Sequence, residues 1–491
     1  MTPPTPPSIL RQPLPALFFL EFPLPMPAAD PPVPAPPAPS PGRAALEFHP
    51  SASVPSIPLF GDSESFRRAG RRALRAAFLG FFVDMFDVYL PVIALGPAMA
   101  YFQPDTLSPA LQSTLFYIVF ALSLVGRPIG AALFGHYGDK LGRRTATIVS
   151  MAGFALVTLL IALLPGYATW GLASLVLLIA LRFVDGIFLG GETSGANPLA
   201  MEYAPQHQRG LWSAIIHTGF PVALLVMSAM TALLLRFSAG AHHAAYLTWG
   251  WRIPFFLGSL FAWAVCFYYL RRIPESPVWA AAPKVRSPLR ELFRGPGLRT
   301  FIQIFCVMTG CWFTLNVVVA ILPGVLLTLR HLSSVLVTNA QMVASLFLAL
   351  ACIPTGILGQ RTSRRRVLAL FGLLGLTIGP ILYYVLVRSA WRSPAAVILL
   401  VTLIDLSAVP VWAIITAYLN ERFSTGVRAS GFGVGYSAAI ILPAFSSLYM
   451  LGLARLGIPY AYTELILFLI GGLLLLIGAL AGPETNHVEI V

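Results

Sequence analysis

Long apolar runs recur along almost the whole chain. A helix needs about 20 mostly apolar residues to cross the roughly 30 Å of hydrocarbon in a bilayer. Twelve runs are long enough, and we expect them as helices at residues 74–100, 111–136, 145–164, 169–198, 210–236, 249–271, 299–328, 336–359, 366–388, 394–420, 429–455 and 461–481. The sequence therefore predicts an all-α integral membrane protein with two sets of six transmembrane helices.

The composition agrees with lipid as the solvent. Hydrophobic residues make up 57% of the 491 residues and charged residues only 10%, whereas a soluble domain is about 25% charged. The net charge of +13 does not indicate nucleic-acid binding, because the basic residues form short clusters between the apolar runs. The four cysteines stand singly in apolar segments with no histidine cluster beside them, so the sequence predicts no metal site and no cofactor.

The spacing of the runs divides the chain into five segments. Residues 1–70 form a tail rich in Pro and Ala, which is predicted to be disordered. Residues 71–272 are expected to form the first six-helix bundle, 273–298 a cytoplasmic linker, 299–482 the second bundle and 483–491 a short C-terminal tail.

Lys and Arg gather at one end of the predicted helices. Five arginines between residues 67 and 75 precede the first helix, and Lys140, Arg143 and Arg144 follow the second. Short loops rich in Lys and Arg stay in the cytoplasm. We therefore expect a multi-pass protein of the inner (plasma) membrane, monomeric, with both termini in the cytoplasm.

Three short motifs occur once in each half of the chain. The pairs are residues 135–144 with 356–365, Glu202 and Arg209 with Glu421 and Arg428, and residues 274–276 with 483–485. Such duplication predicts two pseudo-symmetric six-helix bundles around a central path, the architecture of alternating-access transporters. A duplicated structural protein is the alternative.

Residues 135–144 read GHYGDKLGRR, which has the pattern G-x-x-x-D-(R/K)-x-G-R-R between two predicted helices. This segment resembles the signature loop of the major facilitator superfamily. Further motifs resemble the metabolite:proton symporter family: RPIG at 127–130, GGE at 190–192, EYAP at 202–205, GWRIP at 250–254 and ESP at 275–277. Residues 421–431 also match, although Ser424 stands where that family usually has Pro. The resemblance implies uptake of small organic acids or zwitterionic solutes together with protons.

Asp84 and Asp87 lie three residues apart in the first run and therefore on one side of a helix. An ionised Asp near the bilayer centre costs about 2.5–3.5 kcal/mol on insertion scales, so both are expected to line a water path or meet a cation. A carboxyl out of water beside another takes up a proton more readily, which favours proton coupling over the alternative, a structural salt bridge. The family usually has Glu-Trp-(Phe/Tyr)-Asp here, so Asp87 is the better supported of the two.

Other charged residues lie inside the apolar runs. Arg127 and Arg182 are predicted to bind either a substrate carboxylate or the carboxylates of Asp84, Asp87 or Asp185. Asp185 replaces the Gln that is usual in the family and adds a carboxylate for coupling.

Three further positions complete the predicted interior site. Glu192 is a second proton carrier or a packing residue, and Asp405 is a candidate for substrate binding because it lies inside an apolar run. Trp312 and Trp412 are candidates for stacking on the substrate or for packing.

A set of charged residues is predicted at the cytoplasmic helix ends. It consists of Asp139, Arg143, Arg144, Glu202 and Arg209. The family resemblance implies that this set latches the two bundles together as a cytoplasmic gate. The alternative is that these residues only determine topology.

The predicted function is secondary active transport, with proton-coupled uptake of a small organic acid such as a di- or tricarboxylate by alternating access. The alternatives are uptake of a betaine- or proline-like zwitterion, a proton-antiport exporter and a receptor without transport. An enzyme is not predicted, because the sequence has no nucleophile motif, phosphate loop or metal-ligand cluster. The expected partners are a small-molecule substrate, protons and the lipid bilayer.

Overall fold

The computed structural model describes residues 64–104, 106–107, 109–237, 245–389 and 393–490. Twelve helical stretches in this part of the chain are long and apolar enough to cross a membrane, which confirms the predicted number. None of the described residues forms a β-strand. Most of the predicted tail, residues 1–63, lies outside the described residues.

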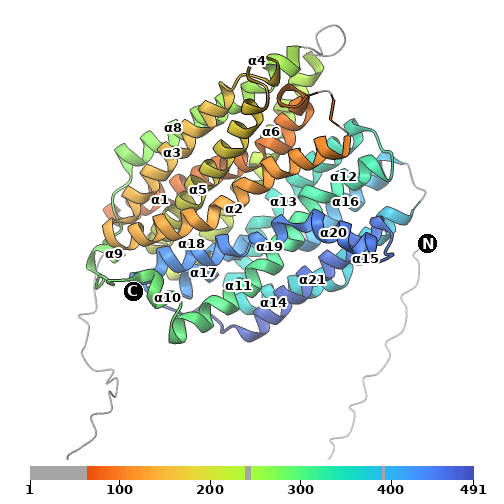
Figure 1. The fold of residues 1–491 in the computed structure, drawn as a ribbon. Helices are drawn as coiled ribbons and strands as arrows, with labels where there is room; N and C mark the ends of the chain where they lie inside the picture. The colour runs from red at the N-terminus through yellow and green to blue at the C-terminus, as the bar shows by residue number, and fades with distance from the viewer. Residues whose placement is uncertain (1–63, 105, 108, 238–244, 390–392, 491) are drawn as a thin grey trace, which may run out of the picture. The chain divides into compact units, whose positions relative to one another are not determined.

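The first half of the described chain holds six of the long helical stretches (Figure 1). Its elements are α1 (Glu64–Leu90), η1 (Pro91–Leu95), η2 (Gly96–Phe102), α2 (Pro109–Leu141), α3 (Arg143–Ala162), α4 (Tyr167–Trp170), α5 (Leu172–Tyr203), η3 (Gln206–Gln208), α6 (Arg209–Phe237), η5 (Tyr246–Gly250) and α8 (Arg252–Arg272).

The linker contains two short helices, α9 (Pro277–Ala281) and α10 (Pro288–Leu292). The second half holds the other six stretches. Its elements are α11 (Gly295–Leu315), η6 (Asn316–Ile321), α12 (Leu322–Thr328), α13 (Ser334–Arg361), α14 (Arg364–Leu376), α15 (Ile378–Arg388), α16 (Pro394–Ala408), α17 (Trp412–Glu421), η7 (Thr425–Val427), α18 (Arg428–Ala438), α19 (Ile441–Ala444), α20 (Ser446–Arg455) and α21 (Tyr460–Ala481).

The first helix begins earlier than predicted from the sequence. α1 starts at Glu64, so residues 64–70 are helical and do not belong to an irregular tail. Glu64 and Arg68 form an ion pair one turn apart, which supports the start of a helix. Phe66 packs on Tyr203 at the end of α5, with 5.1 Å between the ring centroids.

Several predicted helices of the second half are interrupted. The run expected at residues 394–420 is two helices, α16 and α17, which are separated at Val409–Val411 around Pro410. Proline has no N–H to donate and clashes with the preceding turn, so it interrupts a helix. Pro443 lies at a similar interruption in the run expected at residues 429–455.

Glycines allow α2 and α5 to approach closely. A Cβ atom on Gly130 of α2 would overlap the carbonyl oxygen of Ile187 on α5, and a Cβ on Gly190 of α5 would overlap that of Arg127 on α2. Small residues at the interface let the two backbones approach in this way. The approach holds Arg127 beside α5.

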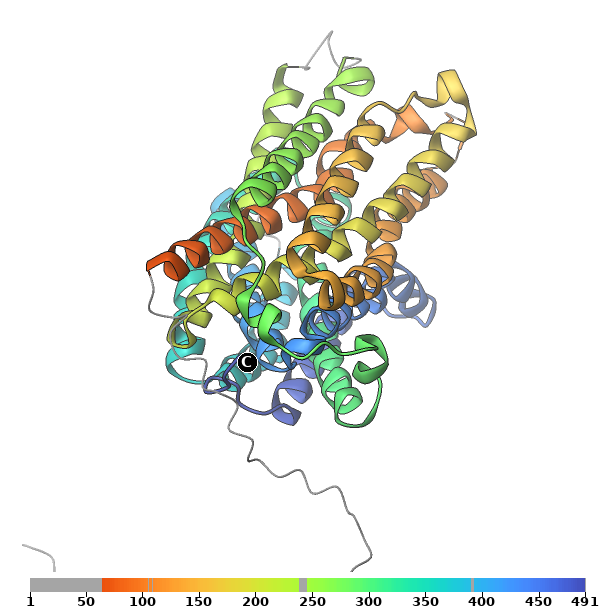
Figure 2. The ribbon, with the colours of Figure 1, turned by 90° about the vertical axis from the view of Figure 1, so that its left-hand side faces the viewer.

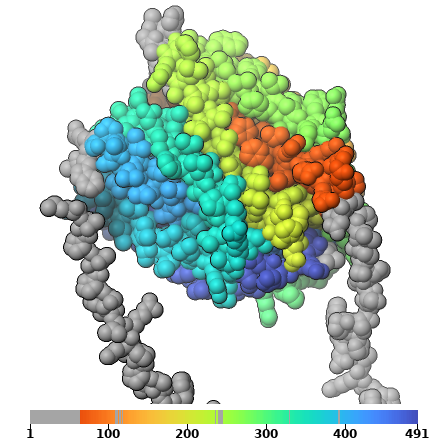
Figure 3. Space-filling model, turned by 180° about the vertical axis from the view of Figure 1, so that it is seen from behind, coloured from red at the N-terminus to blue at the C-terminus, as the bar shows by residue number. Residues whose placement is uncertain are grey.

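The two halves meet mainly along four helix pairs, which include α6 with α17 and α5 with α18. α2 of the first half packs on α18 of the second, and α6 packs on α13. Figure 3 shows α6 and α13 side by side across one face. Residues 135–144 and 202–209 of the first half and 356–365 and 421–428 of the second lie at one end of these helices, which we call the basic end. Figure 2 looks onto the basic end, where the linker passes from the first half to the second.

Candidate functional site

Asp84 and Arg127 form a buried two-pronged ion pair between α1 and α2. Both guanidinium nitrogens Nη1 and Nη2 donate to the carboxylate, at 2.8 Å each. Thr193 on α5 lies between the two: Arg127 donates to its hydroxyl at 3.0 Å, and the hydroxyl lies 3.2 Å from Asp84. The pair is almost completely enclosed, with 0% of Asp84 and 1% of Arg127 exposed. Such a fork-to-carboxylate contact fixes both side chains in one geometry.

Asp87 belongs to a second buried group, one turn further along α1. Arg182 on α5 donates to Asp87 at 3.0 Å and to Asp185 at 2.9 Å. The Thr158 hydroxyl also donates to Asp87, at 2.7 Å, and Arg182 donates to the Ser123 hydroxyl at 3.2 Å. The two aspartates of α1 therefore bind different arginines.

Glu192 is fully buried on α5, and neither of its carboxyl oxygens has a hydrogen-bond partner among the described residues. It packs against Gly80 of α1, where an added Cβ atom would meet the end of the Glu192 side chain. Asp84 and Arg127 are the charged groups that act on it electrostatically. An ionised carboxylate in such a place would be strongly destabilising, so a carboxyl without a cation partner is expected to be neutral.

This part of α1, α2 and α5 holds more carboxyl groups than cations. The four carboxyl groups are those of Asp84, Asp87, Asp185 and Glu192, and the two guanidinium groups are those of Arg127 and Arg182. All six side chains are buried. Buried charges must be paired or neutralised, so a balanced charge requires two protons on the four carboxyl groups.

Aromatic side chains of the second half lie where the two halves meet. The ring centroid of Trp312 lies 4.6 Å from that of Trp412 and 5.4 Å from that of Tyr436, while Trp412 and Tyr436 are 5.8 Å apart. His217 on α6 of the first half lies 6.0 Å from Trp412. The Thr416 hydroxyl lies 3.3 Å from Nδ1 of the same histidine.

Three polar atoms of this aromatic group have no partner in the described part of the chain. They are Tyr436 Oη, Trp412 Nε1 and His217 Nε2. Unpartnered buried polar atoms are rare in proteins and indicate bound water or a ligand. Tyr436 lies on α18, which packs on α2, the helix that carries Arg127.

His217 and Tyr436 are not among the residues predicted from the sequence. The rule that singled out Asp405, an ionisable residue inside an apolar run, applies equally to His217. It also applies to Glu464 on α21, which is buried and accepts a hydrogen bond from the Tyr383 hydroxyl at 2.9 Å. Tyr436 carries no such signal, because tyrosine is also a common packing residue.

Asp405 lies elsewhere in the second half. Gln341 donates to it at 3.2 Å, and the second carboxyl oxygen has no partner among the described residues. None of the described hydrogen bonds or ion pairs connects Asp405 with Arg127 or Arg182. The structure thus does not bring this predicted substrate residue together with the two arginines.

Asp139 and Glu202 connect the two halves at the basic end. The Asp139 carboxylate accepts hydrogen bonds from the backbone N–H groups of Ala429 and Ser430, at 3.0 and 2.9 Å, at the start of α18. A carboxylate at a helix N-terminus is favoured by the unpaired N–H groups and the helix dipole. Glu202 forms ion pairs with Arg143 of its own half and Arg428 of the other. The basic end is therefore closed in this structure.

The second half carries a pseudo-symmetric copy of these contacts. Gln360, the counterpart of Asp139, accepts a hydrogen bond from the Gly210 N–H at the start of α6, at 2.8 Å. Arg364 pairs with Glu421 at 2.8 Å, as Arg143 does with Glu202. Arg209 lies 3.8 Å from the same glutamate and also donates to the Val488 carbonyl.

Arg144 differs from the other residues of the predicted gate. Its guanidinium donates to the carbonyl oxygens of Ile273 and Leu270, at 2.7 and 2.8 Å, within the first half. Its backbone N–H donates to Glu275 at 3.1 Å. The described contacts of Arg144 thus hold the start of α3 to the end of α8 and do not reach the second half.

Glu275 and its counterpart Glu484 cap the starts of α3 and α14. Burial raises the pKa of Glu275, although backbone N–H groups, including that of Ser276, act in the opposite direction. Burial alone would also raise the pKa of Glu484. Hydrogen bonds from the Ser363 hydroxyl and from backbone N–H groups have the larger combined effect, so the pKa of Glu484 is lowered. Among the described residues, no group of three His, Cys, Asp or Glu side chains is placed to hold a metal ion.

Comparison with known proteins places these features in context. Residues 77–434 match the model of the Major Facilitator Superfamily. The chain is 30% identical to the inner membrane metabolite transport protein YhjE of Escherichia coli (strain K12), over 85% of this chain and 94% of that protein. It is 28% identical to the shikimate transporter of the same organism, over 76% of this chain and 85% of that protein.

Two further similarities concern a relative and a fold. The chain is 27% identical to the proline/betaine transporter of Escherichia coli (strain K12), over 76% of this chain and 75% of that protein. The structure of the proton:xylose symporter XylE bound to 6-bromo-6-deoxy-D-glucose superposes with a TM-score of 0.69 at 19% identity, covering 85% of this chain and 96% of that one.

Proposed function

Because the chain belongs to the Major Facilitator Superfamily, we propose that it couples the entry of protons to the uptake of a small organic acid. The basic end faces the cytoplasm in this proposal, as the positive-inside rule predicts. The observation that carries it is the excess of four buried carboxyl groups over two guanidinium groups along α1, α2 and α5.

The Asp84 carboxylate and the substrate carboxylate compete for Arg127. In the structure its two Nη atoms are both engaged by Asp84. A proton on Asp84 removes the negative charge from that carboxyl and frees the guanidinium fork for a substrate carboxylate, whose geometry is the same. Neutrality in the low-dielectric interior is kept only when proton and acid enter together, which is the requirement for symport.

Asp87 and Glu192 complete the proton path in this proposal. Asp87 shares Arg182 with Asp185, so these two carboxyl groups have one cation between them. Glu192 has no partner in the described chain and interacts with Asp84 and Arg127. We assign Glu192 the role of a second proton carrier, next to the pair that binds the substrate.

The aromatic group supports a ring-bearing acid as the substrate. Trp312, Trp412 and Tyr436 offer ring faces and edges where the two halves meet, and His217 and Tyr436 add unpartnered polar atoms. Such a wall suits a small ring with hydroxyl groups and one carboxylate. The shikimate transporter among the relatives is consistent with this class.

A zwitterion such as betaine or proline is the second candidate. Ring faces of Trp and Tyr bind quaternary ammonium groups through cation–π attraction, and the centroids of the same three rings lie 4.6 to 5.8 Å from one another. The proline/betaine transporter among the relatives is consistent with it. An exporter or a receptor without transport would differ from both in the experiment below.

The test is uptake into proteoliposomes that contain the full chain, with and without an inward proton gradient. The panel comprises shikimate, benzoate, succinate, citrate, betaine and proline. We expect gradient-stimulated uptake of a ring-bearing acid, and we expect Asp84→Asn to abolish the stimulation. The matched control is Glu464→Gln, which removes a buried carboxyl on α21 of the second half and leaves both interior groups of the first half unchanged.

Other results would lead to other conclusions. Uptake of betaine or proline alone would support the second candidate. Equal uptake with and without the gradient would rule out proton coupling, binding without uptake would indicate a receptor, and stimulation only by an outward gradient would indicate an exporter.

A further inference from the structure

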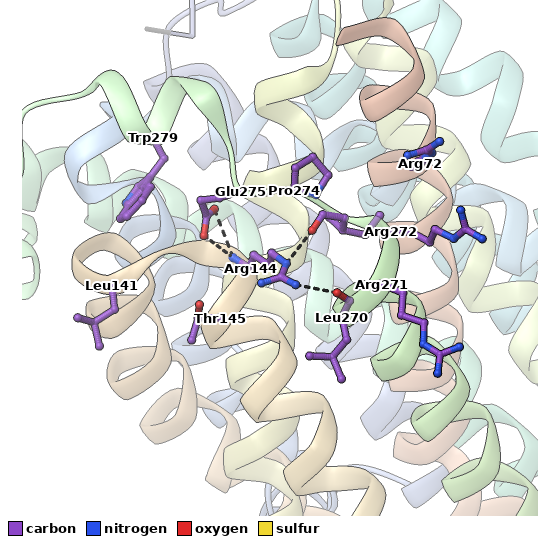
Figure 4. Close-up of a pocket in the computed structure, with 11 residues that line it drawn as sticks. Arg72, Leu141, Arg144, Thr145, Leu270, Arg271, Arg272, Pro274, Glu275 and Trp279 are labelled. Carbon is purple, nitrogen blue, oxygen red and sulfur yellow. Dashed lines mark hydrogen bonds between the residues drawn. The ribbon is translucent and has the colours of Figure 1, made fainter. Parts of the chain in front are cut away.

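A pocket that the transport mechanism does not use lies at the basic end of the first half. It is a cavity of about 610 Å³ between the start of α1, the start of α3, the end of α8 and the linker (Figure 4). Its lining consists of Arg72, Leu141, Arg144, Thr145, Leu270, Arg271, Arg272, Ile273, Pro274, Glu275 and Trp279. Four of these residues are arginines and one is acidic.

The one acidic residue does not neutralise the arginine side chains. The Glu275 carboxylate accepts hydrogen bonds from the backbone N–H groups of Arg144 and Ser276, at 3.1 and 3.0 Å. The Arg144 guanidinium donates to two backbone carbonyl oxygens (Figure 4). The side chains of Arg72, Arg271 and Arg272 take part in none of the described hydrogen bonds or ion pairs. The pocket therefore presents three uncompensated cations.

Apolar side chains border these cations. Leu141 is 66% exposed and Leu270 is 45% exposed, and both line the pocket. In a membrane-spanning bundle, exposed leucines at helix ends contact acyl chains, while arginines just beyond them lie at the level of the lipid headgroups. The pocket thus offers positive charge at headgroup depth beside an apolar surface.

The second half provides an internal comparison. There Arg365 donates to the carbonyl oxygen of Leu480 at 2.7 Å, as Arg144 does to Leu270, and Glu484 caps the start of α14 as Glu275 caps α3. Counted back from the paired Pro274 and Pro483, the counterparts of Arg271 and Arg272 are Leu480 and Ala481, neither of which is charged. The cap at the helix start is therefore built without the arginine pair, so Arg271 and Arg272 are not needed for it.

We propose that this pocket binds the phosphate of an anionic phospholipid, with its acyl chains along Leu141 and Leu270. Basic pockets between transmembrane helices at the cytoplasmic surface bind anionic headgroups, and each nearby arginine strengthens the attraction. The site depends on the proposed orientation of the basic end but not on proton coupling or substrate class. Phosphatidylglycerol is the probe because it carries one negative charge and no cation.

The experiment is native mass spectrometry of the full chain in detergent, titrated with phosphatidylglycerol or phosphatidylcholine. We expect the wild type to bind one phosphatidylglycerol in preference to phosphatidylcholine. The double variant R271Q/R272Q is expected to weaken this binding by about tenfold or more. The control double variant, R361Q/R366Q, removes two exposed arginines from the same end of the second half and is expected to bind as the wild type does.

Each alternative outcome contradicts the proposal. Equal weakening in both double variants would indicate diffuse electrostatic attraction without a site. Unchanged binding in R271Q/R272Q would place the lipid elsewhere. Displacement of the lipid by millimolar inorganic phosphate would assign the pocket to a soluble anion. If R271Q/R272Q does not fold, as judged by size-exclusion chromatography, the single variant R72Q provides the same comparison with R361Q.

Discussion

Asp84 and Arg127 engage each other through both carboxylate oxygens and both Nη atoms, at 2.8 Å, inside the first bundle. Removal of only one member of such a buried pair leaves an uncompensated charge, which costs about 3–5 kcal/mol. We expect Arg127→Ala to lower the thermal unfolding midpoint sharply. The double variant Asp84→Asn/Arg127→Ala should be more stable than Arg127→Ala alone.

The measurement for this pair is a double-mutant cycle followed by tryptophan fluorescence in detergent. A strictly additive cycle would mean that the two side chains do not interact in the folded protein. Arg252→Ala serves as a control for the loss of a buried arginine, because that residue has carbonyl and aromatic partners instead of a carboxylate.

Glu192 should tolerate the loss of its charge. Because it lacks a cation partner in the described chain, we expect it to be neutral when the basic end is closed. Glu192→Gln keeps the shape and is expected to leave the unfolding midpoint within about one degree of the wild type, since no ionic contact is lost. The ratio of protons to substrate in transport, measured from reversal potentials in proteoliposomes, should fall by one.

If Glu192→Gln changes neither the ratio of protons to substrate nor the rate of uptake, Glu192 is not a proton carrier, because a carrier cannot be replaced without effect. Strong destabilisation by Glu192→Gln would instead mean that the residue is ionised and paired. Asp185→Asn is the comparison variant, because Asp185 is a carboxyl of the same helix that does have an arginine partner.

Close packing of α2 on α5 predicts a large effect for one glycine of α2 and a small effect for another. In Gly130→Ala the new methyl group would overlap a backbone carbonyl of α5, which cannot move aside alone. In Gly138→Ala it would lie 3.5 Å from Ala146 and 3.6 Å from Ala429, which is ordinary contact. We expect Gly130→Ala to lower the free energy of unfolding by several kcal/mol and Gly138→Ala to lower it by less than about 1 kcal/mol. Thermal unfolding of the two variants checks this, and equal effects would contradict the packing.

The pseudo-symmetric caps Glu275 and Glu484 should respond to pH in opposite directions. The pKa of Glu484 is lowered on folding, so it contributes stability above its unfolded value of 4.5, and this is lost as the pH falls through the folded pKa. The pKa of Glu275 is raised, so the folded state holds its proton more tightly and stability declines as the pH rises above 4.5.

The measurement compares unfolding midpoints of Glu484→Gln and Glu275→Gln with the wild type between pH 4 and pH 8. The difference in unfolding midpoint between Glu484→Gln and the wild type should be largest at pH 8. The difference between Glu275→Gln and the wild type should be smallest at pH 8. Parallel pH profiles for the two variants would show that the caps have the same electrostatic environment.

The number and approximate limits of the helices followed from the sequence because they depend on the length of apolar runs. The pairing of the interior charges did not follow. Asp84 and Asp87 share one side of α1, yet a single turn separates them along the axis, so Asp84 meets α2 and Asp87 meets Arg182 of α5. Which arginine each aspartate meets depends on how far neighbouring helices are shifted along their axes, and residue spacing within one helix does not determine that shift.

Two consecutive residues of the loop motif also show that the sequence does not determine which groups meet in space. Arg143 and Arg144 are consecutive, so their side chains point about 100° apart around the helix. Arg143 consequently reaches Glu202 and the Thr425 carbonyl of the second half, while Arg144 reaches back to α8. The motif identified both residues, but only the packing around α3 separates the contact between halves from the contact within one half.

Asp139 should keep the basic end closed through its two hydrogen bonds to the start of α18. Asp139→Asn loses the negative charge that the helix N-terminus favours and keeps only one acceptor oxygen, a loss of about 1–2 kcal/mol. If the closed and open forms interconvert, this shifts their ratio about tenfold toward the open form. Spin labels at Tyr137 and Ser424, one in each half, should then report a longer distance in the variant than in the wild type. The counterpart Gln360 makes one such bond, from Gly210, so Gln360→Ala should shift the ratio less. An unchanged distance distribution in Asp139→Asn would show that the ion pairs of Glu202 hold the two halves together without it.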